Sequence, residues 1–145
     1  MEENLRFDEI LASEAQRDGK RTLRLWWGGA PTVVLGCADK PEKELFHDEC
    51  ERRGIAIFKR VTGGGAVLQT PGVLNYSYTA PDPGRLDIHR MFDQGTGLIV
   101  RALAGIGVEA YKRGISDVAV GDRKISGNAQ ARKWRAVLLH GTLLV

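Results

Sequence analysis

A basic side chain and three consecutive glycines stand together near the middle of the sequence. Residues 60–67 read RVTGGGAV, so Arg60 ends a strand-like run that continues directly into a glycine loop. Successive backbone N–H groups in such a loop can bind one anion, because no side chain keeps the ligand away. Arg60 could add a bidentate contact to a phosphate or carboxylate. The P-loop and dinucleotide fingerprints are both absent, so a phosphate cradle and a structural hairpin are equally good interpretations.

A second cluster surrounds Lys124, in the segment 121–129 (GDRKISGNA). A lysine between small residues on a short strand can reach a ligand above the sheet. Its ammonium can then neutralise negative charge that develops during acyl or phosphoryl transfer. Asp117, seven residues earlier, could hold a metal ion or orient an amine. The competing interpretations are a solvated hairpin lysine and a turn aspartate at the start of a strand.

Hydrophobic periodicity predicts the elements that position these residues. Apolar side chains at helical spacing predict helices over 4–16, 41–54 and 88–106. Alternating and β-branched runs predict strands over 22–27, 32–35, 55–61, 73–79, 117–120, 124–126 and 136–145, with a turn at 81–84. Hairpin connections outnumber βαβ crossovers. The sequence therefore predicts an α+β fold, with a mainly antiparallel mixed β-sheet flanked by helices.

Length and composition limit the class of protein. The 145 residues predict one domain over 1–145, and 43% hydrophobic with 27% charged residues argues against disorder. Two cysteines are too few for a disulfide scaffold. No apolar run is long enough to span a membrane and the N-terminus is acidic, so we expect a cytoplasmic protein with no membrane partner. The chain stops at 143–145, inside a predicted strand, so we expect the domain to be incomplete at its C-terminus.

Five segments of the chain occur in a characteristic order. They are TVVLG at 32–36, the arginine and glycine loop at 60–67, SDV at 116–118, GDRKISG at 121–127 and HGTLL at 140–144. Together they resemble the lipoate–protein ligase A branch of the biotin/lipoate ligase superfamily, over essentially the whole chain. The RKISG segment followed by HGTLL is the specific part of the match. The resemblance implies a class II synthetase-like catalytic domain.

The resemblance also implies a reaction and a set of site residues. The family uses ATP and Mg²⁺ to convert lipoate or octanoate to an acyl-adenylate, then transfers the acyl group to a carrier lysine. Lys124 matches the family's active-site lysine, and Asp117 matches an aspartate near the Mg²⁺ ion and the incoming amine. The expected ATP and acyl-adenylate ligands are Arg60, Gly63, Gly64, Gly65, Ala66, Val67, Leu68 and Lys124. The acyl-pocket candidates are Leu74, His140, Gly141 and Leu143.

The expected partner is an acidic lipoyl carrier domain, of the 2-oxoacid dehydrogenase E2 or glycine cleavage H-protein type. A separate accessory domain or subunit is a further expected partner. Basic residues gather late in the chain, at 112–113, 123–124 and 132–135. We interpret them as one surface complementary to the carrier and to ATP. A net charge of +3 is too weak to indicate a nucleic-acid-binding protein.

Two alternatives stay open at this stage. One is an octanoyl or lipoyl transferase that acts without ATP. Its usual form carries a cysteine nucleophile shortly before the lysine motif, whereas residues 111–117 contain none and Cys37 and Cys50 lie far upstream. A transferase that acts through lysine alone is not excluded by this. The other alternative is a non-catalytic truncated module that binds lipoyl groups or the carrier.

Overall fold

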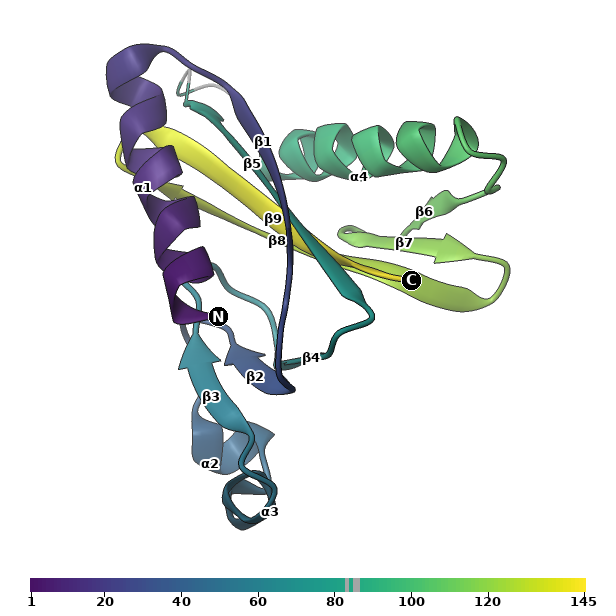
Figure 1. Ribbon diagram of the computed structural model, residues 1–145. Coiled ribbons are helices and arrows are strands. Elements are labelled where there is room, and N and C mark those ends of the chain that lie inside the picture. Colours follow the sequence, from purple (N-terminus) through teal and green to yellow (C-terminus); the bar gives the residue numbers. More distant parts are fainter. Residues whose placement is uncertain (83, 85–86) are drawn as a thin grey trace.

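The strands of the protein form two sheets in the computed structural model, which describes residues 1–82, 84 and 87–145 (Figure 1). The larger sheet is antiparallel throughout, in the order β1 (Thr22–Trp27), β5 (Val73–Pro81), β9 (Ala136–Leu144), β8 (Arg123–Lys133), β7 (Asp117–Val120) and β6 (Tyr111–Arg113). In the smaller sheet, β2 (Thr32–Leu35) pairs parallel with β3 (Ala56–Lys59) and antiparallel with β4 (Val67–Gln69). The predicted α+β class with a mainly antiparallel sheet is confirmed.

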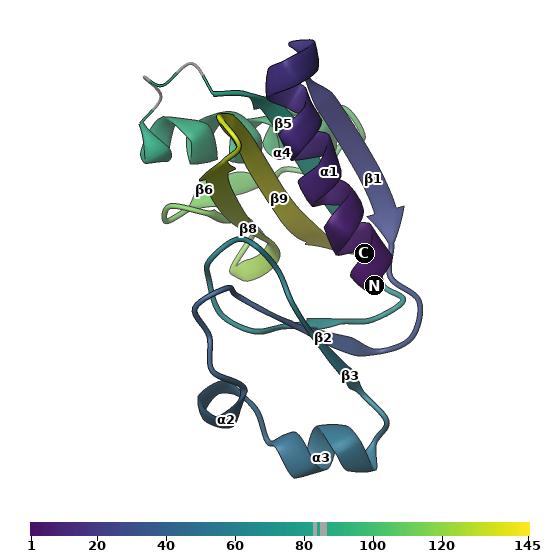
Figure 2. The same ribbon diagram turned by 90° about the vertical axis from the view of Figure 1, so that its left-hand side faces the viewer.

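Two long helices cover opposite faces of the larger sheet (Figures 1 and 2). They are α1 (Glu2–Asp18) and α4 (Ile88–Ala104). Side chains alternate between the faces of a strand, so neighbours in β5 and β9 point to different helices. Tyr76 and Leu139 lie in the core on the α4 side, whereas Ser77 bonds to Asp8 of α1. The α4 side holds the apolar core, and the α1 side carries buried polar groups.

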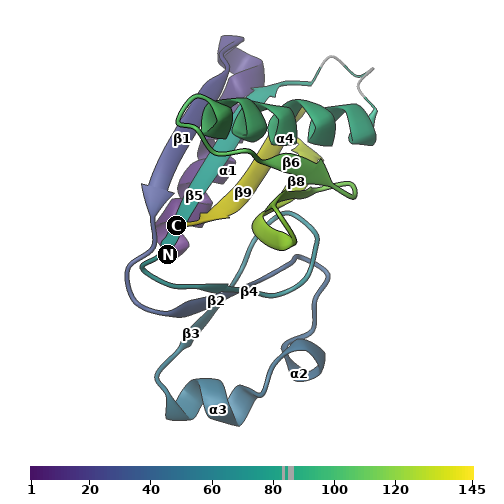
Figure 3. The ribbon, with the colours of Figure 1, turned by 90° about the vertical axis from the view of Figure 1, so that its right-hand side faces the viewer.

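Close packing explains the glycine in the middle of α4. Gly95 is buried, and a Cβ atom there would lie 2.6 Å from Cδ1 of Leu139. Glycine disfavours a helix, but at this position it lets the helix approach the sheet. The predicted helix over 88–106 is found over 88–104. Figure 3 shows it lying across the sheet beside β6 and β8.

The single helix predicted over 41–54 is wrong. The chain instead forms α2 (Pro41–Glu44) and α3 (His47–Arg52), and Leu45 between them is extended. Neither short helix buries a residue, and Phe46 is 88% exposed. Helices of this length need tertiary packing for their stability, so nothing here holds one continuous helix together.

The other differences between the prediction and the structure concern very short strands and one strand that is longer than predicted. The three-residue strands β4 and β6 carry too little pattern to be predicted, and β8 continues to Lys133 rather than ending near 126. The turn predicted at 81–84 includes Pro83, which lies outside the described residues. Among the helices of the described ranges, none has the length and apolar character needed to cross a membrane.

Candidate functional site

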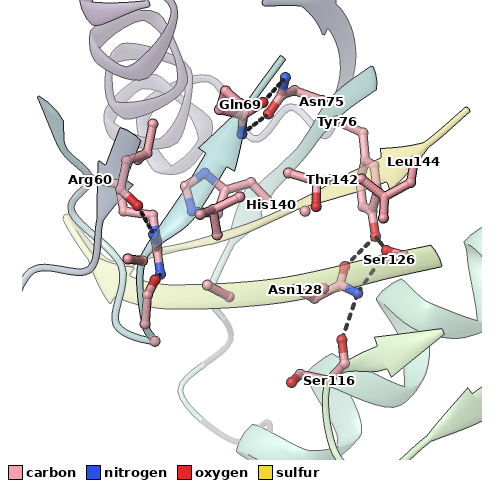
Figure 4. Close-up of a pocket in the computed structure, with 18 of the residues that line it drawn as sticks. Arg60, Gln69, Asn75, Tyr76, Ser116, Ser126, Asn128, His140, Thr142 and Leu144 are labelled. Atoms are coloured by element: carbon pink, nitrogen blue, oxygen red, sulfur yellow. Dashed lines mark hydrogen bonds between the residues drawn. The ribbon is translucent and has the colours of Figure 1, made fainter. Parts of the chain in front are cut away.

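A pocket of about 550 Å³ lies where the α1 face of the larger sheet meets β4 and the glycine loop (Figure 4). It gathers predicted site residues from four separate parts of the sequence. Those that line it are Arg60, Gly64, Gly65, Ala66, Val67, Leu68, Asp117, Lys124, His140 and Gly141. Gly63 belongs to the same loop but does not line the pocket. The sequence clusters around Arg60 and Lys124 therefore contribute to a single cavity.

Lys124 forms an ion pair at one end of this pocket. Its Nζ lies 2.9 Å from Oδ1 of Asp117, which faces it from β7. The lysine side chain passes over Gly127, where a Cβ atom would lie 3.1 Å from Lys124 Cε and 3.2 Å from Nζ. Gly127 thus leaves room for the ammonium above the sheet. The lysine is half exposed, within the pocket wall and open to a ligand.

The floor of the pocket is one transverse row of residues across five strands. Asp117 pairs with Gly127, Gly127 with Thr142, Thr142 with Asn75, and Asn75 with Trp26. All five residues line the pocket. Neighbouring strands are about 4.8 Å apart, so the row extends for roughly 19 Å. It begins at the ion pair and ends at an indole ring.

Arg60 forms its hydrogen bonds with other groups of the protein. Its Nη2 donates to the carbonyls of Gly63 (2.7 Å) and Gly65 (2.9 Å), and its Nη1 donates to that of Val34 (3.0 Å). Its Nε donates to Oγ1 of Thr62 at 3.1 Å. A guanidinium has five N–H groups, and these contacts use four of them. Arg60 therefore orders the glycine loop and has no free pair of donors for the bidentate ligand contact expected from the sequence.

The loop's own N–H groups face away from Arg60. A trans peptide holds its C=O and the following N–H in opposite directions, so the N–H groups of Gly64 and Ala66 point away from the guanidinium. In the described part of the chain, the Gly64 N–H has no acceptor. Gly64 has φ +90°, a conformation that favours glycine. Gly36 packs directly beneath its carbonyl, where a Cβ atom would lie 3.0 Å from the carbonyl carbon and closer still to the oxygen.

A buried carboxylate forms the α1 wall of the pocket. Asp8 is 1% exposed, and its Oδ1 accepts hydrogen bonds from Arg24 and Ser77, each at 2.7 Å. Its Oδ2 lies 3.8 Å from Nδ1 of His140. Burial alone would raise the pKa of Asp8, but His140, Ser77 and Arg24 together hold this pKa below its usual value. Asp8 is therefore a stable anion inside the fold.

Replacing Asp8 with asparagine is expected to lower the free energy of unfolding by about 3 kcal/mol at pH 7, because Arg24 loses its buried counter-charge. A lowered folded-state pKa stabilises the protein above the unfolded pKa of about 3.9, and this contribution is lost as the pH falls through the folded value. The difference between wild type and Asp8→Asn should therefore shrink on acidification. Urea unfolding at pH 7 and in acid measures it, with Glu3→Gln on the exposed side of α1 as control. A difference that is independent of pH would contradict the assignment.

A polar cluster that the sequence did not indicate also contributes residues to the pocket lining. The Tyr76 hydroxyl donates to Oδ1 of Asn128 and lies 3.1 Å from Oγ of Ser126 (Figure 4). Asn128 Nδ2 donates to the carbonyl of Ser116 at 2.7 Å, which fixes the residue before Asp117. Burial raises the pKa of Tyr76 to about 12, so its hydroxyl remains a donor. Gln69 and Asn75 form a second buried pair, with reciprocal amide hydrogen bonds of 2.9 and 3.0 Å.

Two acyl-pocket candidates lie elsewhere. Leu74 and Leu143 face each other across β5 and β9, and neither lines the pocket. Leu143 packs against the core on the α4 side, because it points to the opposite face of β9 from its neighbours Thr142 and Leu144. That alternation could have identified Leu144 as the leucine of β9 that lines the pocket. The large apolar side chains of the pocket are Leu5, Trp26, Val34, Val67, Leu68, Tyr76 and Leu144.

The basic residues do not form the single surface expected from the sequence. Arg123 and Lys124 begin β8, and β6, which lies beyond β7 in the same sheet, carries Lys112 and Arg113. The residues at 132–135 lie at the other end of β8 and in the turn that follows. A strand rises about 3.4 Å per residue, so the two groups are roughly 34 Å apart. Only the first group adjoins the pocket.

The described residues contain no group of three or more His, Cys, Asp or Glu side chains that could hold a metal ion by itself. Asp117 is the accessible carboxylate of the pocket, since Asp8 is buried. Magnesium sites in nucleotide-binding proteins commonly combine one or two carboxylates with substrate phosphates. Asp117 fits that chemistry only together with a phosphate-bearing ligand.

The sequence profile of the lipoyl protein ligase A/B catalytic domain matches residues 1–145. The chain belongs to this family. The Bacillus subtilis lipoate-protein ligase LplJ is 35% identical to this lipoyl protein ligase A/B domain over 141 residues, which cover 97% of the chain and 41% of the relative. The family resemblance drawn from the ordered segments is confirmed.

Solved structures agree with this family assignment. A bi-partite lipoate protein ligase from Thermoplasma acidophilum, studied with its E2 lipoyl domain, has a TM-score of 0.90 and 32% identity, covering 98% of this chain and 56% of its own. A lipoate-protein ligase A solved with ATP has a TM-score of 0.87 and 30% identity, covering 97% and 60%. The lipoyl protein ligase A/B domain described here thus spans between two fifths and two thirds of these proteins.

Proposed function

We propose that the chain carries the acyl-adenylate-forming site of a lipoate–protein ligase, within a single catalytic domain over residues 1–145. In this proposal it binds ATP with lipoate or octanoate, joins them as an acyl-adenylate, and passes the acyl group to a lysine of a lipoyl carrier domain. One observation carries the proposal. The ammonium of Lys124 and the glycine loop, with N–H groups facing away from Arg60, line the same pocket.

The charges of the first step match these groups. The carboxylate of the acid attacks the α-phosphorus of ATP, and pyrophosphate leaves. Two anions must approach each other for this, so a fixed cation between them lowers the barrier. Lys124 supplies that cation. The N–H groups of Gly64 and Ala66 supply donors for phosphate oxygens without introducing a side chain.

The row of residues on the pocket floor suits an extended acyl chain. In the proposed pose the carboxyl end lies at Lys124, and the aliphatic tail runs over Gly127 and Thr142 toward Trp26. The apolar side chains of Leu5, Leu68 and Leu144 would cover the tail. Their burial by a ligand is favourable in proportion to the apolar area removed from water.

Asp117 is the residue that would hold Mg²⁺ together with the phosphates of bound ATP. The ion would supply charge neutralisation at the phosphates. Asp117 also holds Lys124 in place, through the 2.9 Å ion pair. For the second step we propose that a carrier lysine enters at this end of the pocket, where its amine attacks the acyl carbonyl and AMP leaves. Asp117 would orient the incoming amine.

Carrier engagement is expected to weaken with salt. Exposed Arg113 and Arg123 lie near Lys124, and an acidic carrier would approach this rim by charge attraction. Arg123→Ala should raise the KM for the carrier several-fold at low ionic strength and less at high ionic strength. Lys133→Ala, at the far end of β8, is the matched control and should leave the KM unchanged. A KM that is equal at low and high salt would count against this docking surface.

Mass analysis of a carrier tests the proposed function. A lipoyl domain of a 2-oxoacid dehydrogenase E2 is incubated with the chain, ATP, Mg²⁺ and lipoate, with and without a separately expressed accessory domain of a longer relative. The proposal predicts a mass gain of one lipoyl group that requires ATP. A gain from an acylated donor without ATP would support the transferase instead. No gain in any mixture would support a binding module.

A further inference from the structure

We propose that Thr62 and His140 are positioning residues that set Arg60 and, through it, the anion-binding glycine loop. This inference rests on the proposed function, because it assigns a role within the same site. Sequence motifs draw attention to Arg60 and the glycines, whereas the polar contacts behind them come from other elements. From α1 to the loop these groups are Asp8, His140, Thr62 and Arg60, with hydrogen bonds joining the last three.

The Thr62 hydroxyl contacts both Arg60 and His140. Its Oγ1 lies 3.1 Å from Nε of Arg60 and 2.6 Å from Nε2 of His140, a residue 78 positions later in the chain. Arginine N–H groups can only donate, so the threonine oxygen accepts from Arg60. The hydroxyl proton is then free to donate to the His140 nitrogen. Thr62 is 1% exposed, so water does not offer substitute partners.

Asp8 faces the other side of His140. Its Oδ2 lies 3.8 Å from His140 Nδ1, beyond hydrogen-bond distance, so the carboxylate acts on the ring through its charge. Asp8 is itself fixed by Arg24 of β1 and Ser77 of β5. The charged groups around His140 are therefore the Asp8 carboxylate on one side and the Arg60 guanidinium beyond Thr62. Turning the imidazole would break its 2.6 Å hydrogen bond with Thr62.

The glycine loop depends on this arrangement because it has no side chains of its own to hold it. Arg60 Nη2 is the donor to both the Gly63 and Gly65 carbonyls, and the direction of those carbonyls sets the direction of the N–H groups that follow. If the Thr62 hydroxyl is lost, the buried Nε of Arg60 has no acceptor. Arg60 then re-orients, and the N–H groups no longer converge on one anion. ATP binding should suffer, and lipoate binding should not.

The test compares two variants of Thr62. Valine keeps the shape of threonine and removes the hydroxyl, whereas serine keeps the hydroxyl. Thr62→Val is expected to weaken ATP binding about tenfold or more, the usual consequence of a buried donor without an acceptor. Lipoate binding should change less than about twofold, within the usual effect of a remote site. Thr62→Ser should retain ATP affinity. Calorimetric titration with ATP alone and with lipoate alone measures both.

A second pair of variants covers the case in which Thr62→Val does not fold. In His140→Gln the side-chain amide can reach the position of Nε2 and bond to Thr62, whereas the shorter side chain in His140→Asn cannot. ATP affinity should survive in His140→Gln and fall in His140→Asn. Equal losses in Thr62→Val and Thr62→Ser, or equal losses of ATP and lipoate affinity, would overturn the inference. Wild-type protein that binds no ATP would contradict the proposed function itself.

Discussion

Replacing Lys124 with alanine should reduce lipoate-dependent ATP–pyrophosphate exchange by about two to three orders of magnitude. A preorganised group that stabilises transition-state charge typically contributes that much. The ammonium lies 2.9 Å from Asp117 and lines the pocket that holds the glycine loop. Without it, the attacking carboxylate and the α-phosphate repel each other with no cation between them. Exchange of radiolabelled pyrophosphate into ATP measures the first step alone, independently of any carrier.

Lys133→Ala is the matched control for this prediction. Lys133 lies on the same strand as Lys124, outside the pocket, and should leave exchange unchanged. Lys124→Ala should also leave the thermal unfolding midpoint nearly unchanged, because the side chain is half exposed and its ion pair is accessible to water. Exchange at the wild-type rate in Lys124→Ala would contradict a role for the lysine in acyl-adenylate formation.

Gly36→Ala should abolish detectable ATP binding and destabilise the fold by about 1–3 kcal/mol, the usual range for overpacking. The new methyl group would overlap the carbonyl oxygen of Gly64 and would lie 3.0 Å from its carbonyl carbon. The obstacle is backbone, so no side-chain rotation relieves it. The glycine loop must move, and its N–H groups move with it. Titration with ATP and urea unfolding measure the two effects.

A second glycine in the same part of the chain provides the control. At Gly29 no atom of the described structure lies within 4 Å of an added Cβ. Gly29→Ala should therefore leave ATP affinity and stability close to wild type. If Gly36→Ala bound ATP as tightly as Gly29→Ala, the position of the loop would not matter for the nucleotide.

Much of this site could be predicted from the sequence, because its key residues lie in locally recognisable segments. The glycine loop directly follows β3, and Lys124 lies on a strand between small residues. Strands over 22–27 and 32–35 are found as predicted, since each shows a clear pattern and ends near glycine. Local pattern thus located both the cation and the loop. Only the family resemblance, and not this local pattern, placed the two in one site.

The remaining features depend on contacts between distant residues. Asp8 bonds to Ser77, 69 positions away, and Thr62 lies against His140. Such pairs leave no pattern in the local sequence, so the buried polar contacts behind the loop could not be predicted. The sequence also suggests that Arg60 binds a ligand, whereas its guanidinium bonds to the carbonyls of the loop itself. The direction of a guanidinium depends on tertiary contacts, which the sequence does not show.

Amide NMR with a non-hydrolysable lipoyl-adenylate analogue tests the central claim most directly. If Lys124 and the loop bind the same phosphate, three signals should shift together and saturate at one ligand concentration. They are the N–H resonances of Gly64 and Ala66 and the Nζ signal of Lys124. Resonances of Gly29, outside the pocket, should not move. Saturable binding that leaves the Gly64, Ala66 and Lys124 signals in place would contradict the account.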